Sequence, residues 1–253
     1  MTNLAKNKVT RSQMMNWLIS KPCQLCQRKI ELANTSKVSL GNSKILCEHC
    51  LRVLFDNATK NLTISTLGIP ELKNMSTHII APFYHQNLIL LMLNNFKYRY
   101  HLKQGRILIQ SLVDSITEFY FFKPMPDFIF TIPSPQKRYQ QKGWETTEFL
   151  AKTLARTFNI PLIKLLSRHG QPSQQAGLSK SARKKNVKNT IALKTDQLQR
   201  IVLSNSKTIR IALVEDVVTT GATAAEAIRT LTPFIDASSI DIWCLTIPIL
   251  RKS

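Results

Sequence analysis

Apolar and polar residues recur along most of the chain with periods that predict helices and strands in alternation. Within residues 101–120 the apolar positions 107, 108, 112, 113 and 116 have the spacing of an amphipathic helix. The same spacing predicts further helices over residues 143–158 and 221–231. Short apolar runs at 127–132, 209–214 and 239–248 predict buried strands. Strands that alternate with helices favour an α/β fold with a mainly parallel sheet.

Four parts of the chain differ in pattern. Residues 1–20 resemble a basic leader, and residues 21–58 contain four of the five cysteines. Residues 59–77 are polar and rich in turn formers, which predicts a connector to an α/β domain over residues 78–253. Inside that domain, residues 168–189 have no core-forming period and carry six Lys or Arg without an acidic residue. A long stretch of this kind is either functional or disordered.

Composition and charge say more about the binding partners of the protein than about its fold. The chain has 253 residues, of which 43% are hydrophobic, so it can bury a substantial core. A net charge of +20 predicts attraction to polyanions such as nucleic acid, an anionic membrane or phosphorylated small molecules, although a basic proteome would also explain it. The longest apolar run after the leader, residues 88–93, is far below the ~20 residues that span a bilayer. We therefore expect a cytoplasmic protein without membrane insertion.

The cysteines form two C-x2-C pairs separated by 20 residues: Cys23, Cys26, Cys47 and Cys50. Two such pairs can present four thiolates tetrahedrally to Zn²⁺, and four protein ligands leave no open position for catalysis. The spacing thus predicts a structural zinc module, with unligated cysteines or an iron–sulfur cluster as the alternatives. Cys244 lies in an apolar strand pattern and is expected in the core.

The stretch "IALVEDVVTTGAT", residues 211–223, contains the chain's main candidate for a binding site. Glu215 and Asp216 follow a buried strand, and ligands of open α/β sheets bind beyond the carboxyl ends of strands. The following turn offers hydroxyls, backbone N–H groups and a helix N-terminus to an anion, and Gly221 allows close approach. The carboxylates would accept hydrogen bonds from hydroxyls, so a sugar phosphate with a vicinal diol satisfies both halves of the site.

This pattern resembles the 5-phosphoribosyl-1-pyrophosphate (PRPP) motif of type I phosphoribosyltransferases. The resemblance implies that Glu215 and Asp216 bind the ribose hydroxyls. It implies that the 5-phosphate is held by Thr219, Thr220, Gly221, Ala222 and Thr223. Over residues 21–250 the chain resembles the ComF family of competence-associated proteins, in which a zinc module precedes a phosphoribosyltransferase-like domain. "NNFKYRY", "TIPSPQKRYQQKGW" and "RHGQPSQQAGLSKSARKKN" are similar to stretches of that family.

The resemblance implies a reaction in which a nucleophile displaces pyrophosphate from ribose, with Mg²⁺ and basic residues stabilising the leaving group. Lys137 and Arg138 are the candidates for contacts to the pyrophosphate, Asp216 is the acidic candidate, and residues 168–189 are a candidate lid. No residue pattern identifies the acceptor, and no role is assigned to His78, His85, His101 or His169.

Two functions stay open at this stage. The first is a Mg-dependent phosphoribosyltransferase of nucleotide metabolism with an unknown acceptor. The second is a PRPP-binding protein of DNA uptake and transformation whose partners are single-stranded DNA and a competence helicase. Residues 134–188 are strongly basic, and Tyr139 and Trp144 could stack on bases, although helical spacing favours core packing for Trp144. The sequence does not predict an oligomeric state.

Overall fold

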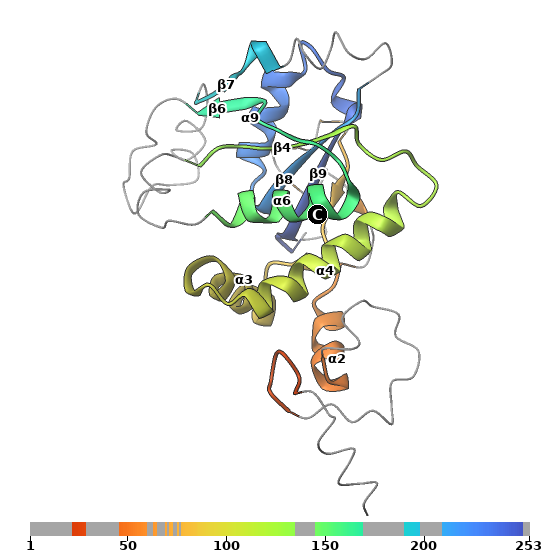
Figure 1. The fold of residues 1–253 in the computed structure, drawn as a ribbon, viewed down its shortest axis with the longest axis vertical. Coiled ribbons are helices and arrows are strands. Elements are labelled where there is room, and N and C mark those ends of the chain that lie inside the picture. The colour runs from red at the N-terminus through yellow and green to blue at the C-terminus, as the bar shows by residue number, and fades with distance from the viewer. Residues whose placement is uncertain are drawn as a thin grey trace, which may run out of the picture. The chain divides into compact units, whose positions relative to one another are not determined.

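The computed structural model in Figure 1 describes residues 22–28, 46–59, 63–64, 69, 71–72, 75, 77–134, 145–168, 190–197 and 209–249. The chain divides into two compact units, Met1–Asp56 and Asn57–Ser253. None of the helices within the described ranges combines the length and the hydropathy that a bilayer crossing requires.

The described part of the first unit consists of a turn and one helix. Helix α2, Glu48–Asp56, buries Cys50, Leu51 and Leu54 along one face. The N–H of Gln27 donates to the carbonyl of Cys23 at 2.9 Å, and this bond closes a turn around the first cysteine pair. Most of the segment between the two cysteine pairs lies outside the described residues.

The second unit contains a seven-stranded sheet in the order β1-β2-β9-β8-β4-β5, with β3 also paired to β9. All pairings in this sheet are parallel except that of β1 with β2. The strands are β1 Thr63–Ile64, β2 Ile79–Ile80, β3 Phe83–Tyr84, β4 Phe128–Thr131, β5 Leu162–Ile163, β8 Ile211–Val217 and β9 Ile240–Ile247. A separate antiparallel pair is formed by β6 Leu166–Arg168 and β7 Ile191–Leu193.

Helices cover both faces of the sheet (Figure 1). They are α3 Asn87–Arg99, α4 Leu102–Phe119, α6 Thr146–Phe158 and α9 Ala222–Leu231, with a short 3-10 turn at Ala237–Ser239. Side chains alternate between the two faces of a strand, so Leu213 and Ile242 pack with α9 in one core cluster. Trp243 points to the other face, where its ring lies 5.8 Å from the rings of both Tyr120 and Phe158.

The structure confirms the expected α/β class with a mainly parallel sheet and a four-cysteine cluster in the N-terminal part. The expected helices are present as α4, α6 and α9, and Cys244 is fully buried. Within residues 59–77, expected to be a connector, Ile69 and Leu72 are fully buried in the core that contains α9. Trp144 and Tyr139 lie outside the described residues.

Candidate functional site

Strand β8 lies between β9 and β4, and the two acids are near its carboxyl end. It was expected to end at residue 214 but continues to Val217, so Glu215 and Asp216 lie within the strand rather than beyond it. Glu215 is in register with Cys244, and Val217 with Thr246. The carboxyl ends of the parallel strands β4, β8 and β9 meet at this edge, which is the usual ligand side of such a sheet.

Asp216 forms an ion pair with a residue from a distant part of the chain. Lys97 Nζ, near the C-terminal end of α3, lies 2.6 Å from Asp216 Oδ2. Both side chains are mostly buried, with exposed fractions of 21% for the lysine and 16% for the aspartate. A partly buried, charge-assisted bond of this length is stronger than an exposed pair. The sequence analysis did not assign Lys97 to the site, although the stretch "NNFKYRY", which resembles the ComF family, contains it.

Glu215 differs from its neighbour because part of its carboxylate has no partner. Its Oε1 atom is buried and accepts no hydrogen bond. Burial, followed by the charge of Asp216, raises the pKa of Glu215 to about 8, against the opposing effect of Lys97 and Arg168. A buried oxygen without a donor is costly, so this atom is suited to a ligand that brings a donor or a positive charge.

The threonine loop, residues 219–223, leads from β8 into α9. At Gly221 its backbone has a conformation that only glycine adopts readily. Gly221 has φ 76° and ψ 3°, in the left-handed region. A Cβ atom at this position would lie 2.8 Å from Ile69 Cγ2 and 2.8 Å from Leu72 Cγ, so the position also lacks room. Because the residue before α9 has no side chain, it cannot cap the helix, and the N-terminal N–H groups remain oriented for an anion.

The threonines differ in exposure along this loop. Thr219 and Thr220 are exposed and Thr223 is partly exposed, so their hydroxyls can reach a ligand. The only described contact of the Ala222 N–H is a long one of 3.4 Å to Thr220 Oγ1. The loop therefore provides hydroxyls and a helix N-terminus within a few residues of the two acids, as the sequence predicted.

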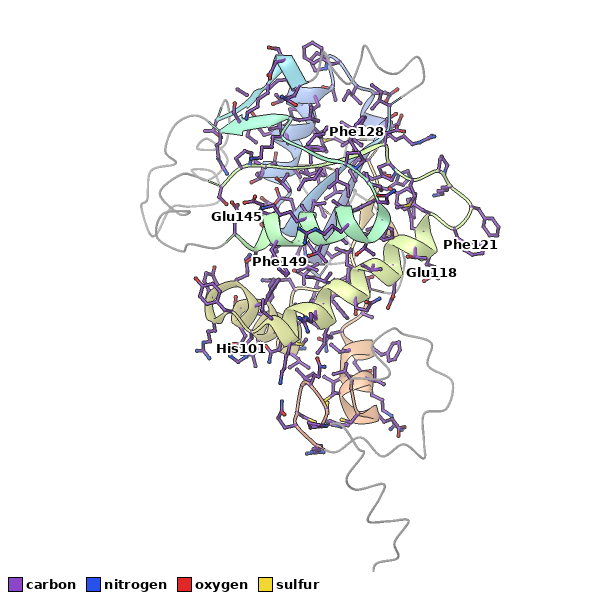
Figure 2. All side chains as sticks on the ribbon, viewed as in Figure 1. His101, Glu118, Phe121, Phe128, Glu145 and Phe149 are labelled. Atoms are coloured by element: carbon purple, nitrogen blue, oxygen red, sulfur yellow. The ribbon has the colours of Figure 1, made fainter. Side chains whose placement is uncertain are left out.

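Two further ionisable groups belong to the same electrostatic environment, and sequence reasoning missed both. His85 Nδ1 lies 3.0 Å from Thr246 Oγ1, and burial, followed by the charge of Lys97, lowers the pKa of His85. Glu145, at the start of α6 (Figure 2), is hydrogen-bonded by the Ser134 hydroxyl. Burial raises the pKa of Glu145, and the charges of Glu148 and Asp216 raise it further, while the bond from Ser134 lowers it.

Lys137 and Arg138, predicted to contact pyrophosphate, lie outside the described residues. The same holds for the proposed lid apart from its first residue. That residue, Arg168, ends strand β6, and its charge acts on Glu215.

The four cysteines of the first unit come together as predicted. Their sulfur atoms all lie within 4.8 Å of one another. Sγ of Cys26 and Sγ of Cys47 are 3.6 Å apart, too far for a disulfide and close to the roughly 3.8 Å that a tetrahedral Zn–S₄ geometry requires.

The protonation of these thiols also fits a bound cation. Burial, together with hydrogen bonds to the neighbouring cysteines, raises the pKa of Cys50. Burial opposes ionisation of Cys23 as well, but backbone N–H groups lower the pKa of that thiol to about 7. Four thiolates this close together would repel one another, so a divalent metal is their natural counterion.

Two curated proteins resemble the chain over 122 residues. It is 30% identical to the DNA utilization protein YhgH of Escherichia coli (strain K12) and 30% identical to Competence protein F of Haemophilus influenzae. The predicted resemblance to the ComF family is confirmed. These matches cover 48% of this chain and 49% and 50% of the two relatives, so the chain spans about half the length of the curated relatives it matches. No family model matches the chain.

Two solved structures overlap the chain weakly. Adenine phosphoribosyltransferase from Leishmania tarentolae is 14% identical with a TM-score of 0.35, over 67% of this chain and 76% of that one. The allosteric regulatory enzyme of purine biosynthesis is 12% identical with a TM-score of 0.32, over 77% and 33% of the two chains. At these TM-scores the overlaps support no conclusion about activity.

Proposed function

We propose that this protein binds PRPP together with Mg²⁺ at residues 215–223 and acts in DNA uptake and transformation. The observation that carries the proposal is the buried, unpartnered Oε1 of Glu215. This atom lies next to Asp216 and a few residues before the N-terminus of α9, which follows Gly221. A vicinal diol supplies donors to the carboxylates, and a phosphate at the other end of the same sugar suits the N–H groups and hydroxyls of the loop. The names of the matched relatives, DNA utilization protein and Competence protein F, support the biological role.

The protein's own groups would divide the work of binding. Glu215 and Asp216 would accept hydrogen bonds from the ribose hydroxyls, while the loop from Thr219 to Thr223 would surround the 5-phosphate. Lys97 would hold the Asp216 carboxylate in place before the ligand arrives. Mg²⁺, which proteins bind largely through substrate phosphates, would neutralise charge on the pyrophosphate. Lys137 and Arg138 are proposed to contact the same group.

Zinc is proposed as the ion of the cysteine cluster, with a structural role. Its four ligands would be Cys23, Cys26, Cys47 and Cys50, so no position would remain for a substrate.

Turnover is the second candidate function. It is favoured by His85 and Glu145, whose pKa values are shifted in opposite directions beside the carboxylate pair. A histidine with a lowered pKa is neutral at pH 7 and could take a proton from an acceptor nucleophile. Pyrophosphate release from PRPP in the presence of candidate acceptors would test this activity.

Calorimetric titration of Mg²⁺-PRPP into the full chain tests the binding proposal. We expect Asp216→Asn to weaken binding about 10- to 100-fold, the range expected for loss of hydrogen bonds to a charged group. Asp236→Asn is the matched control, because Asp236 is an exposed carboxylate that bonds only to Ser238 among the described residues. Equal affinity of Asp216→Asn and the control would remove Asp216 from the site.

The affinity for PRPP is also expected to rise with pH up to about 8. Below that value Glu215 is protonated in the free protein, while a bound diol favours the ionised form that accepts its hydrogen bonds. Binding must then release a proton, and affinity should rise by at most about tenfold per pH unit between pH 6.5 and 7.5. Titrations in buffers of different ionisation enthalpy measure the released proton. Glu215→Gln should flatten this dependence, and an identical pH profile in both proteins would contradict the assignment.

A further inference from the structure

Part of the segment expected to be a connector belongs to the core around the threonine loop. The structure describes Ile69, Glu71, Leu72 and Met75 in this part of the chain, and we call these four residues the brace. Ile69 and Leu72 are fully buried, and Met75 packs against the same core cluster. That cluster also contains the alanines of α9 at positions 224, 225 and 227. A segment that only joins two units would stay on the surface, so the burial of the brace calls for another explanation.

The brace has an ordered backbone of its own. The N–H of Leu72 donates to the carbonyl of Ile69 at 2.9 Å, and the N–H of Met75 donates to the carbonyl of Leu72 at 2.9 Å. Each of these bonds spans three residues, which is the pattern of a tight turn. Two consecutive turns therefore hold Ile69 and Leu72 in a fixed relation to each other, and their side chains form one apolar surface.

This surface meets the threonine loop at Gly221. A Cβ atom at residue 221 would lie 2.8 Å from both Ile69 Cγ2 and Leu72 Cγ, and 2.9 Å from Leu72 Cδ1. Ordinary contacts between carbon atoms are about 3.5–4.0 Å. The two side chains of the brace thus fill the space that a side chain at residue 221 would occupy, and they lie against the backbone where the loop enters α9.

A backbone hydrogen bond also joins the brace to the middle of the loop. The N–H of Glu71 donates to the carbonyl of Thr220 at 3.3 Å. The strand that precedes the loop is held to the sheet by the Val218 N–H, which donates to the Thr246 carbonyl at 3.1 Å. Among the described residues, the bond from Glu71 is the one backbone bond that ties Thr219 or Thr220 to another segment. The brace therefore restrains the part of the loop that neither the sheet nor the helix restrains.

The side chain of Glu71 adds a weaker contact. Its Oε2 atom lies 4.0 Å from Nη2 of Arg229 on α9. The arginine is 48% exposed and also lies 3.4 Å from Oε2 of Glu226. Long and exposed ion pairs contribute little to stability, so the apolar contact at Gly221 and the backbone bond to Thr220 are the main restraints.

We propose that the brace positions the threonine loop for the 5-phosphate of its ligand, with Ile69 and Leu72 as positioning residues. The inference rests on the proposed function and extends the site to residues outside 215–223. Hydroxyls and N–H groups bind a phosphate tightly only when they are held in the binding geometry beforehand. Thr219 and Thr220 are exposed, so their own packing does not supply that order. The brace supplies it through Gly221 and the Thr220 carbonyl.

The coupling between the brace and the ligand must be reciprocal. If the brace favours the loop conformation that binds phosphate, a bound ligand stabilises the brace by the same factor. Mg²⁺-PRPP is therefore expected to slow hydrogen exchange at the amides of Glu71, Leu72 and Met75. The amide of Leu112, in α4 and outside this core cluster, is the reference and should be slowed less.

Calorimetric titration of the full chain with three probes tests the proposal. Leu72→Ala should weaken binding of Mg²⁺-PRPP and of ribose 5-phosphate by the same factor, roughly tenfold, because both present a 5-phosphate to the loop. Its affinity for Mg²⁺-pyrophosphate should not change, because that group is not assigned to the loop. Leu72→Met keeps the volume of the side chain and should restore both sugar phosphate affinities.

Leu112→Ala is the matched control, because Leu112 is also fully buried but lies outside the core cluster of the brace. It should lower thermal stability as Leu72→Ala does and leave all three affinities unchanged. If Leu72→Ala does not fold, the smaller truncations Leu72→Val and Leu112→Val replace the pair.

A double-mutant cycle separates the contact at Gly221 from a general loss of packing. The methyl group of Gly221→Ala can enter the space that Leu72→Ala leaves. The loss of ribose 5-phosphate affinity in the double variant should therefore be smaller than the product of the two single losses, by at least about threefold. Gly221→Ala combined with Leu112→Ala should show losses that multiply.

Two results in the variants would overturn the proposal. One is wild-type affinity for ribose 5-phosphate in folded Leu72→Ala. The other is an equal loss of affinity for Mg²⁺-pyrophosphate, which would indicate general damage to the α/β unit. Failure of the proposed function has a different signature, because the wild type itself would then bind neither sugar phosphate. The brace would in that case have no phosphate site to position, and this inference would fall with the proposed function.

Discussion

Removal of zinc is expected to unfold residues 21–58 and to leave the α/β unit folded. The described apolar core of the first unit consists of a few side chains, among them Leu46, Leu51 and Leu54, besides two of the cysteines. A module of this size rarely folds on its own core, and a structural zinc ion contributes on the order of 10 kcal/mol to such folds. We therefore expect the metal to supply most of the stability of this unit.

Cys23→Ser tests this expectation because it removes one of the four ligands without changing the α/β core. The variant should lose its metal in elemental analysis and should lose the amide resonances of residues 21–58, while the α/β resonances persist. Cys244→Ala is the matched control: Cys244 is fully buried in β9 of the other unit, so this variant should retain one zinc per chain. Retention of zinc by Cys23→Ser would contradict the assignment. Iron and visible absorbance would instead identify an iron–sulfur cluster.

Periodicity predicted the long elements of the fold but not the short ones. Helices α4, α6 and α9 each bury one stripe of side chains, so their period is visible in the sequence. Strands β1, β2, β3 and β5 have two residues each, too few to display a period of two. Helix α3 was missed as an element because its first half is a continuous apolar run, Leu88–Leu93, which blurs the contrast between its two faces.

The candidate site was predictable only where it is local in sequence. The acids and the threonine loop lie within one stretch of nine residues, so their types and order indicated a sugar-phosphate site. Lys97 meets Asp216 from 119 positions away, and His85 meets Thr246 from 161, and no local pattern encodes such contacts. His78, to which no role was assigned, likewise places Nδ1 3.0 Å from Asp241 Oδ1 at the start of β9.

Gly221→Ala is expected to destabilise the α/β unit and to weaken PRPP binding. Two costs add at this position. The left-handed backbone costs a residue with a Cβ atom roughly 1–2 kcal/mol. The new methyl group would also lie 2.8 Å from Ile69 and Leu72, both fully buried, and such overpacking typically costs about 1–3 kcal/mol. The sum, about 2–5 kcal/mol, is a large part of the stability of an ordinary domain.

Gly221→Asn separates the two costs, because asparagine tolerates the left-handed region but keeps the Cβ atom. If contact with Ile69 and Leu72 dominates, urea denaturation should show both variants destabilised, with asparagine only slightly better than alanine. If the backbone dominates, asparagine should recover most of the stability. In either case the loop that presents the helix N-terminus must move to admit the new atom. The affinity of the remaining folded protein for Mg²⁺-PRPP should therefore fall in both variants. Ala225→Gly, in the middle of the same helix, provides the comparison: it should cost about 1 kcal/mol and leave PRPP affinity unchanged. Wild-type stability and affinity in Gly221→Ala would show that neither the backbone nor the close packing at residue 221 shapes the site.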